Sequence, residues 1–175
     1  MTDEESADYV VAASDAFLDF GAIQVPMLEG LDIALHLEHD TQRGVGLGLT
    51  YGSSMADVQV FARAKDEHMW PSTRDELIAA LAQQQVSSEI VIGTFGSEVR
   101  CTLPTIDFDG NNIIAPARFV GVDGDRWFMR IAISGAAAVD RIEVDKIDQL
   151  IGKLIVTRGD AAMSPGEALT LTIPA

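Results

Sequence analysis

The segment Leu31-Asp-Ile-Ala-Leu-His-Leu37 alternates apolar and polar side chains, and Gly44-Val-Gly-Leu-Gly-Leu-Thr-Tyr51 repeats the alternation a few residues later. A period of two directs successive side chains to opposite faces of a strand, so each segment predicts a half-buried β-strand. The connection between them is short, which suits antiparallel neighbours because parallel strands need a long crossover. These two segments therefore predict the centre of an antiparallel sheet.

The alternation continues on both sides of these two segments. Residues 23–27 precede them with apolar side chains at every second position, and residues 58–62 follow them in the same way. The short turns at Glu29-Gly30 and at Tyr51-Gly-Ser-Ser54 separate the runs. We therefore expect a meander of four strands within residues 22–64.

The second half of the chain contains more strands. They are expected over residues 89–95, 98–103, 113–122 and 126–134, with an edge strand in the tail at 168–174. The segments Asp107-Phe-Asp-Gly-Asn-Asn112 and Asp123-Gly-Asp125 have the composition of hairpin turns.

Two segments have helical periodicity instead. Residues 73–85 carry an apolar stripe, and Thr73 and Glu76 have the spacing of a capping box. Residues 142–156 carry a second stripe, with Asp140 placed to cap its start. Strands interrupted by helices predict an α+β fold, in which an antiparallel sheet of about seven to nine strands lies between two or three helices.

The first twenty residues differ from the rest of the chain. They contain six acids and no base, and residues 21–175 are expected to form a single α+β domain behind them. Apolar side chains such as Tyr9, Ala13 and Phe17 recur at helical spacing, which favours a short amphipathic helix. A disordered acidic leader is the alternative.

Composition restricts the classes of function. The 175 residues include 12 bases and 27 acids, a formal net charge of −15, so nucleic acid and anionic membrane surfaces are not expected partners. No apolar run reaches the length of about 18 residues that a transmembrane helix needs. Cys101 is a lone cysteine, which excludes an internal disulfide and fits a reducing compartment, so we expect the cytoplasm.

Motifs for common cofactors are incomplete. Gly44-Val-Gly-Leu-Gly48 lacks the third glycine position of a dinucleotide-binding loop, and no helix follows it. The turn that begins at Asp107 has Asn112 and Arg118 where a calcium loop needs glycine and glutamate. We therefore predict no cofactor, no metal site and no catalytic residue.

Arginines on the predicted strands are the polar residues of greatest interest. Arg100, Arg118 and Arg130 lie on or beside three of these strands. In so acidic a chain an internal network of ion pairs, with partners such as Glu98, is one interpretation. A pocket for a small anion, built from the same three arginines, is the other.

A second group of residues suggests a protein-binding surface. Gly44, Gly46 and Gly48 leave one face of their strand without side chains, so another backbone or helix can approach it closely. Trp127 lies on another of the predicted strands, residues 126–134. We assign these four residues as candidate contacts with a protein partner or with a second copy of the chain.

Several segments together resemble a known family. They include Leu18-Asp-Phe-Gly-Ala-Ile-Gln-Val-Pro26, the stretch from Arg118 to Arg130, Gly135-Ala-Ala-Ala-Val-Asp140 and the region 156–165. In this order they resemble domain of unknown function 3710, a bacterial family found chiefly in actinobacteria, over roughly residues 15–174. The family implies no activity. More loosely, the turn, aromatic strand and closing helix at 123–156 resemble the PsbP-like fold, which implies an antiparallel sheet between helices and a role in binding or assembly.

Function is not specified by any single motif. The absence of convergent acid, base or nucleophile residues favours a non-catalytic cytoplasmic module that binds a protein or supports assembly. A sensor or enzyme acting on a small anionic ligand held by the arginines is the alternative. A third hypothesis is that the acidic leader mimics nucleic acid or docks on a basic partner.

Overall fold

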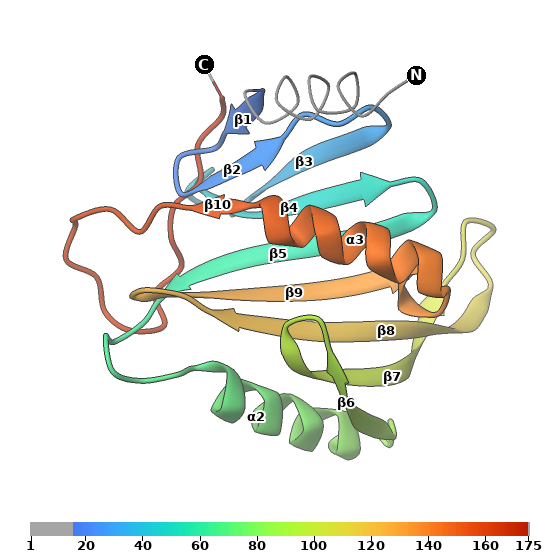
Figure 1. Cartoon of the computed structure of the whole chain (residues 1–175). Helices are drawn as coiled ribbons and strands as arrows, with labels where there is room; N and C mark the ends of the chain where they lie inside the picture. The colour runs from blue at the N-terminus through green and yellow to red at the C-terminus, as the bar shows by residue number, and fades with distance from the viewer. Residues whose placement is uncertain (1–15, 175) are drawn as a thin grey trace, which may run out of the picture.

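A computed structural model describes residues 16–174, and one large antiparallel sheet forms the centre of the fold (Figure 1). Its seven strands are β3 (Leu31–Leu37), β4 (Gly44–Tyr51), β5 (Ser54–Ala62), β6 (Ser88–Gly93), β7 (Gly96–Ile106), β8 (Asn112–Asp123) and β9 (Trp127–Gly135). They lie in the order β3-β4-β5-β9-β8-β7-β6. All neighbours are antiparallel, as the short connections predicted for strands that follow each other in the chain, whereas the pairing of β5 with β9 joins segments far apart in the sequence.

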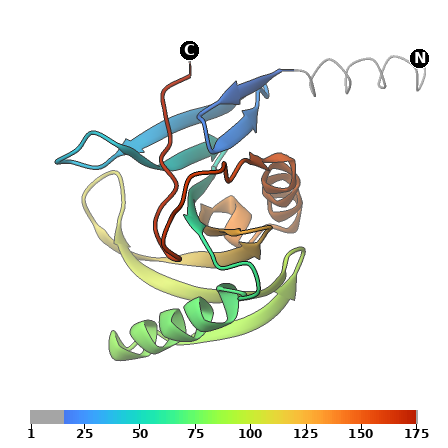
Figure 2. The ribbon, with the colours of Figure 1, turned by 90° about the vertical axis from the view of Figure 1, so that its left-hand side faces the viewer.

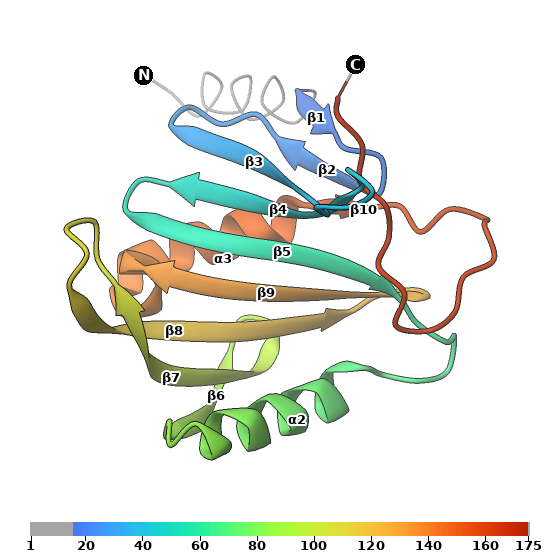
Figure 3. The same ribbon diagram turned by 180° about the vertical axis from the view of Figure 1, so that it is seen from behind.

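A smaller sheet and two helices complete the described fold. The small sheet has the order β1-β2-β10 and consists of β1 (Phe17–Asp19), β2 (Ile23–Pro26) and β10 (Ile155–Val156). The helices are α2 (Trp70–Gln83) and α3 (Arg141–Lys153), and the 3-10 turn η1 (Ala136–Ala138) leads into α3. Figures 2 and 3 show α3 and the small sheet on one side of the large sheet. They show α2 near β6 and β7, at the end of the large sheet away from β3.

The main core fills the space between the large sheet, α3 and the small sheet. Val58 on β5 lies opposite Ile131 on β9, and both are fully buried. They belong to one cluster with Ile147 and Leu150 of α3 and with Ile23 of β2. Because burying each such side chain contributes about 1.5–3 kcal/mol, this cluster is the main source of stability.

A second apolar cluster attaches α2 to the opposite face of the large sheet. Trp70 and Leu81 of α2 pack with Val99 of β7 and Phe128 of β9. Phe128 alternates with Met129 and Ile131, which face α3, so the two helices cover opposite faces of the sheet. Gly121 is required beneath Trp70, since a Cβ atom there would lie 2.2 Å from the indole ring.

The predicted fold class is confirmed: the described chain is an α+β protein with an antiparallel sheet between helices. The meander predicted within residues 22–64 is correct for β3, β4 and β5, but β2 is not part of it. β2 pairs with β1 and β10 in the small sheet instead. Alternation identifies a strand without identifying its neighbour, so the sequence pattern could not separate the two sheets.

Element boundaries also differ from the expectations. Residues 17–19 form a strand where the sequence favoured the end of a helix, and residues 1–15 lie outside the described part of the chain. α3 ends at Lys153, because Ile155 and Val156 pair with β2. The tail forms isolated bridges to Gly21, Gly44 and Phe61 in place of a continuous edge strand.

The capping box predicted at Thr73 and Glu76 is wrong. α2 begins earlier, at Trp70, and its first amides are capped from outside the helix. The carboxylate of Asp123, at the end of β8, accepts hydrogen bonds from the backbone N–H groups of Met69 at 2.8 Å and Trp70 at 3.1 Å. The cap predicted at Asp140 is confirmed, since its side chain accepts from the N–H groups of Ile142 and Glu143.

Candidate functional site

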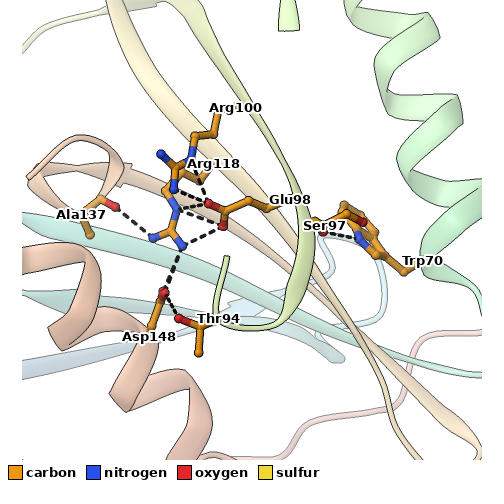
Figure 4. A network of polar contacts seen from close by, with 8 residues as sticks. All are labelled: Trp70, Thr94, Ser97, Glu98, Arg100, Arg118, Ala137 and Asp148. Carbon is orange, nitrogen blue, oxygen red and sulfur yellow. Dashed lines mark hydrogen bonds and ion pairs between the residues drawn. The ribbon is translucent and has the colours of Figure 1, made fainter. Parts of the chain in front are cut away.

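Arg118 is the centre of a buried ion-pair network between the large sheet and α3 (Figure 4). Its side chain points from β8 toward α3 and is 0% exposed. Nη2 lies 2.8 Å from Oε2 of Glu98 on β7 and 3.1 Å from Oδ1 of Asp148 on α3. Nη1 donates a 3.0 Å hydrogen bond to the carbonyl of Ala137 in η1. The guanidinium therefore joins two strands, the 3-10 turn and the helix.

Arg100 belongs to the same network. It lies directly opposite Arg118 in the β7–β8 ladder, where two like charges would repel each other. Glu98 offsets this repulsion, because its Oε1 atom accepts from Nε of Arg100 at 2.8 Å and from Nη2 at 2.6 Å. Thr94 completes the network with a 2.8 Å hydrogen bond to Oδ2 of Asp148.

The network is close to electrically neutral. Burial by itself lowers the pKa of Arg118, but the hydrogen bonds and negative charges of Glu98 and Asp148 outweigh it, so the pKa of this guanidinium lies above its usual value. Two guanidiniums face two carboxylates, and Arg118 donates its hydrogen bonds to Glu98 and Asp148 of its own chain. Arg118 therefore has a structural position in the core.

Arg130 lies away from the other two predicted arginines. It is opposite Gly121 on the face of the sheet that α2 covers, whereas Arg118 faces α3. Its guanidinium lies 5.2 Å from the centre of the Phe61 ring and donates to the side-chain oxygen of Gln59. The structure thus brings Arg100 and Arg118 together and leaves Arg130 on the opposite face.

An open cavity of about 810 Å³ borders the network at Arg100. We name it the α3 cavity. It lies between β6, β7 and β8 on one side and the beginning of α3 on the other, and its polar lining includes Arg100, Arg141, Glu89 and Thr102. Within the described residues, Arg141 has no hydrogen bond or ion pair. Arg141 was not a sequence candidate, because an arginine in the first turn of a helix carries no signal of its own.

Cys101 also lines the α3 cavity, but it is a buried thiol. Burial raises its pKa above the usual value, so the thiol stays protonated at neutral pH. A protonated thiol is a poor nucleophile and a poor metal ligand. Cys101 therefore acts as a small packing residue between α2 and the sheet.

The three strand glycines are buried within this chain. A Cβ atom on Gly44 would lie 2.4 Å from the carbonyl oxygen of Leu171, so the C-terminal tail approaches β4 at this point. Gly48 is covered by the ring of His36, whose Nε2 atom lies 3.2 Å from Oδ1 of Asp57. Gly46 lies between these two positions and is also buried. The expected close approach of another backbone occurs at Gly44, and the backbone is that of the same chain.

Trp127 is half-buried at the start of β9. Its ring packs against the main core and lies above Gly124, where a Cβ atom would come within 2.0 Å of the indole. The ring thereby packs against the turn between β8 and β9.

The outer half of the β7–β8 hairpin exposes several large apolar side chains. Ile106 is 66% exposed and Ile114 is 71% exposed, and the Phe108 side chain at the tip is fully exposed. The register places Pro104 opposite Ile114, two residues from Ile106 and therefore on the same face of the hairpin. We name Pro104, Ile106, Phe108 and Ile114 the hairpin surface.

Metal and membrane features were also sought in the described part of the chain. Among residues 16–174, no group of three or more His, Cys, Asp or Glu side chains could hold a metal ion. Neither α2 nor α3 has the length and apolar character required to cross a membrane.

The fold and these sites define an α+β protein with an antiparallel sheet between helices and a buried ion-pair network beneath α3. The model of the family described as "Protein of unknown function (DUF3710)" matches residues 3–175, so the chain belongs to this family, as the sequence resemblance indicated. A search of curated proteins finds no match.

Among solved structures, the chain is weakly similar to that of cyanobacterial PsbP (CyanoP) from Synechocystis sp. PCC 6803. The TM-score is 0.39 and the sequence identity is 11%, over 78% of this chain and 87% of the CyanoP chain. This is the PsbP-like resemblance expected from the sequence, and it concerns the fold alone.

Proposed function

We propose that this protein is a non-catalytic cytoplasmic module that binds a protein partner through the hairpin surface. The observation that carries the proposal is the exposure of Ile106, Phe108 and Ile114 on one projecting hairpin. Large apolar side chains that gather on an exposed surface commonly mark interaction sites, since leaving them in water is unfavourable. A hairpin that projects from the sheet can enter a groove on another protein.

Charge indicates the kind of partner. Asp107 and Asp109 flank Phe108 at the tip, and the chain carries a net charge of −15. Complementary potentials accelerate association and exclude wrong partners. We therefore propose a partner with an apolar groove bordered by lysine or arginine side chains. A second copy of this chain would bring the same carboxylates together, which disfavours self-association through this surface.

The proposal does not use the strand glycines or Trp127. Gly44, Gly46 and Gly48 are covered by the tail and by His36, and Trp127 packs on the core. We also infer that residues 21–175 act as one domain, because the amide of Leu171 donates to the carbonyl of Gly44 and thereby ties the tail to the first strands.

The test combines substitutions on the hairpin with a matched control. The Ile106→Asp, Ile114→Asp double variant should lose a partner that the unchanged protein retains in affinity purification from native cells. Met27→Asp is the control, because Met27 is also exposed, at 54%, but lies beside the small sheet. Retention by the control and loss by the double variant support the proposal.

Two outcomes would overturn it. In one, the double variant retains every partner of the unchanged protein. In the other, sedimentation of the pure protein shows a stable dimer that the double variant abolishes, which would assign the hairpin surface to a second copy. Circular dichroism melting should give the same Tm for all variants, because the substituted side chains are exposed.

A further inference from the structure

The α3 cavity combines two guanidiniums with apolar side chains on both of its walls. Arg100 enters it from β7 and Arg141 from the first turn of α3. Its volume of about 810 Å³ lies within the range of about 300–1,000 Å³ that is typical of ligand sites. Neither the hairpin surface nor the core requires an open space at this position.

Both arginines retain hydrogen-bond donors for a ligand. Arg100 directs Nε and Nη2 to Glu98, so within the described residues its Nη1 group has no partner, and its side chain is 37% exposed. Arg141 is exposed and has no partner among residues 16–174. A planar guanidinium can bind a carboxylate through two parallel hydrogen bonds.

Charge at the cavity limits a ligand to a single negative charge. Arg100 and Arg118 are balanced by Glu98 and Asp148, and the charges that remain on the lining are the guanidinium of Arg141 and the carboxylate of Glu89, which lies opposite Arg100 in the β6–β7 ladder. Glu89 lies on the lining, and the whole chain carries −15. A multiply charged group such as phosphate is repelled by this field more strongly than one carboxylate is.

Part of the remaining lining is apolar and can contact a hydrocarbon body. Pro116 of β8 lies on one wall, and Val139 and Val144 lie on the other. Val139 is 67% exposed, so a ligand here would cover it. The first free amides of α3 are already capped by Asp140, so the arginines are the groups that remain for an anion.

We propose that the α3 cavity binds an organic acid with one carboxylate on an apolar body. The carboxylate binds to Arg141 and to the free edge of Arg100, and the apolar body packs on Val139, Val144 and Pro116. The carboxylate comes either from a free small acid or from a glutamate or aspartate of another chain, and the guanidinium chemistry is the same in both cases.

The test is an NMR titration of the ¹⁵N-labelled full chain with two probes. The first probe is 3-phenylpropionate, a free acid, and the second is the peptide acetyl-Leu-Glu-Leu-amide. We expect the amide signals of residues 87–89 and 139–144 to shift on binding. Binding of the acid alone identifies a free ligand, and binding of the peptide alone or more tightly identifies a chain-borne carboxylate.

Three variants test the residues. Arg141→Glu removes the guanidinium that has no partner among residues 16–174, and Thr102→Glu adds a negative charge to the lining while leaving both arginines in place. Each should weaken binding by about tenfold or more, as expected for the loss of a charged hydrogen bond. Lys153→Glu changes the charge equally at the exposed far end of α3 and should leave the affinity unchanged.

The proposal is overturned if neither probe binds, if the control weakens binding as much as Arg141→Glu, or if inorganic phosphate binds more tightly than both probes. None of these results affects the hairpin surface, because Ile106 and Ile114 do not line the cavity. Conversely, a hairpin double variant that retains every partner would overturn the proposed function and would leave the result of the titration unchanged.

Discussion

Nη2 of Arg118 lies 3.1 Å from Oδ1 of Asp148, although the two residues are 30 positions apart and neither is exposed to water. This contact joins the large sheet to α3 through charge, beside the apolar side chains of the main core. Isolated buried charges are costly, so each member of the network depends on the others. This contact and the contacts of Asp123, Gly44 and Asp107 can each be tested by substitution.

Replacing Arg118 with methionine should destabilise the protein by about 3–5 kcal/mol, because Asp148 would be left buried without its cation and Glu98 would keep Arg100 alone. Urea unfolding followed by circular dichroism measures the loss. The matched control, Lys153→Met, removes an exposed charge at the last residue of α3 and should change stability by less than about 0.5 kcal/mol. Unchanged stability of Arg118→Met would contradict the structural role of this arginine.

Replacing Asp123 with alanine should destabilise α2. The substitution leaves the N–H groups of Met69 and Trp70 without their acceptor, and the loss of such a cap costs about 0.5–2 kcal/mol. Hydrogen exchange should accelerate in the first turn of α2. Asp125→Ala, in the adjacent exposed turn, is the control, and equal acceleration in both variants would exclude capping by Asp123.

Two Gly→Ala substitutions should have opposite effects. At Gly44 the new Cβ atom would meet the carbonyl oxygen of Leu171 at 2.4 Å, and displacing the tail should cost about 1–3 kcal/mol. At Gly152, in α3, no atom lies within 4 Å of the new Cβ, so the better helix propensity of alanine should stabilise the protein by up to about 1 kcal/mol. Thermal melting of both variants measures the difference. A stabilising Gly44→Ala would show that the tail does not pack on β4.

The turn of the β7–β8 hairpin should loosen in acid. Hydrogen bonds to the Asp107 carboxylate, first of all from the backbone N–H of Asn111, lower the pKa of this group below its usual value. A carboxylate with a lowered pKa adds stability above the pKa of the unfolded chain, and this stability is lost as the pH falls through the lowered value. The amide signals of Asp109 and Asn111 should therefore shift with acidification.

Asp107→Asn supplies the control for this titration. The variant has no carboxylate at this position, so the amide signal of Asn111, a residue without a carboxylate of its own, should shift much less over the same acidic range. A shift of equal size in the variant would assign the change to another group.

Part of the fold could be predicted because strand periodicity is local. The alternation in residues 31–37 and 44–51 identified β3 and β4, and the short turns predicted their antiparallel pairing. Asp140 was recognised as a cap because a cap and its amides lie within three residues of each other. By contrast, the cap at the start of α2 comes from Asp123, more than fifty residues later, so no local pattern could contain it.

The arginine candidates show the same limit for the site. Their positions on strands, and the interpretation as ion pairs with Glu98, came from the sequence, and the contacts of Arg100 and Arg118 agree with that interpretation. Arg130 is separated from Arg100 and Arg118 because it lies on the face of the sheet that α2 covers, and the sequence did not show which helix covers which face. Arg141 lines the cavity only because the first turn of α3 lies across it from β7.

The order of side chains along the chain was sufficient for the α+β class, the antiparallel pairing of β3, β4 and β5, and the strong negative charge, since each depends on neighbouring residues or on composition alone. The assignment of β2 to a second sheet, the burial of Arg118 between Glu98 and Asp148, and the opening of a cavity beside Arg100 were decided by tertiary packing. These features depend on how segments distant in the chain meet, and the free energy of such contacts exists only once the core between them has formed.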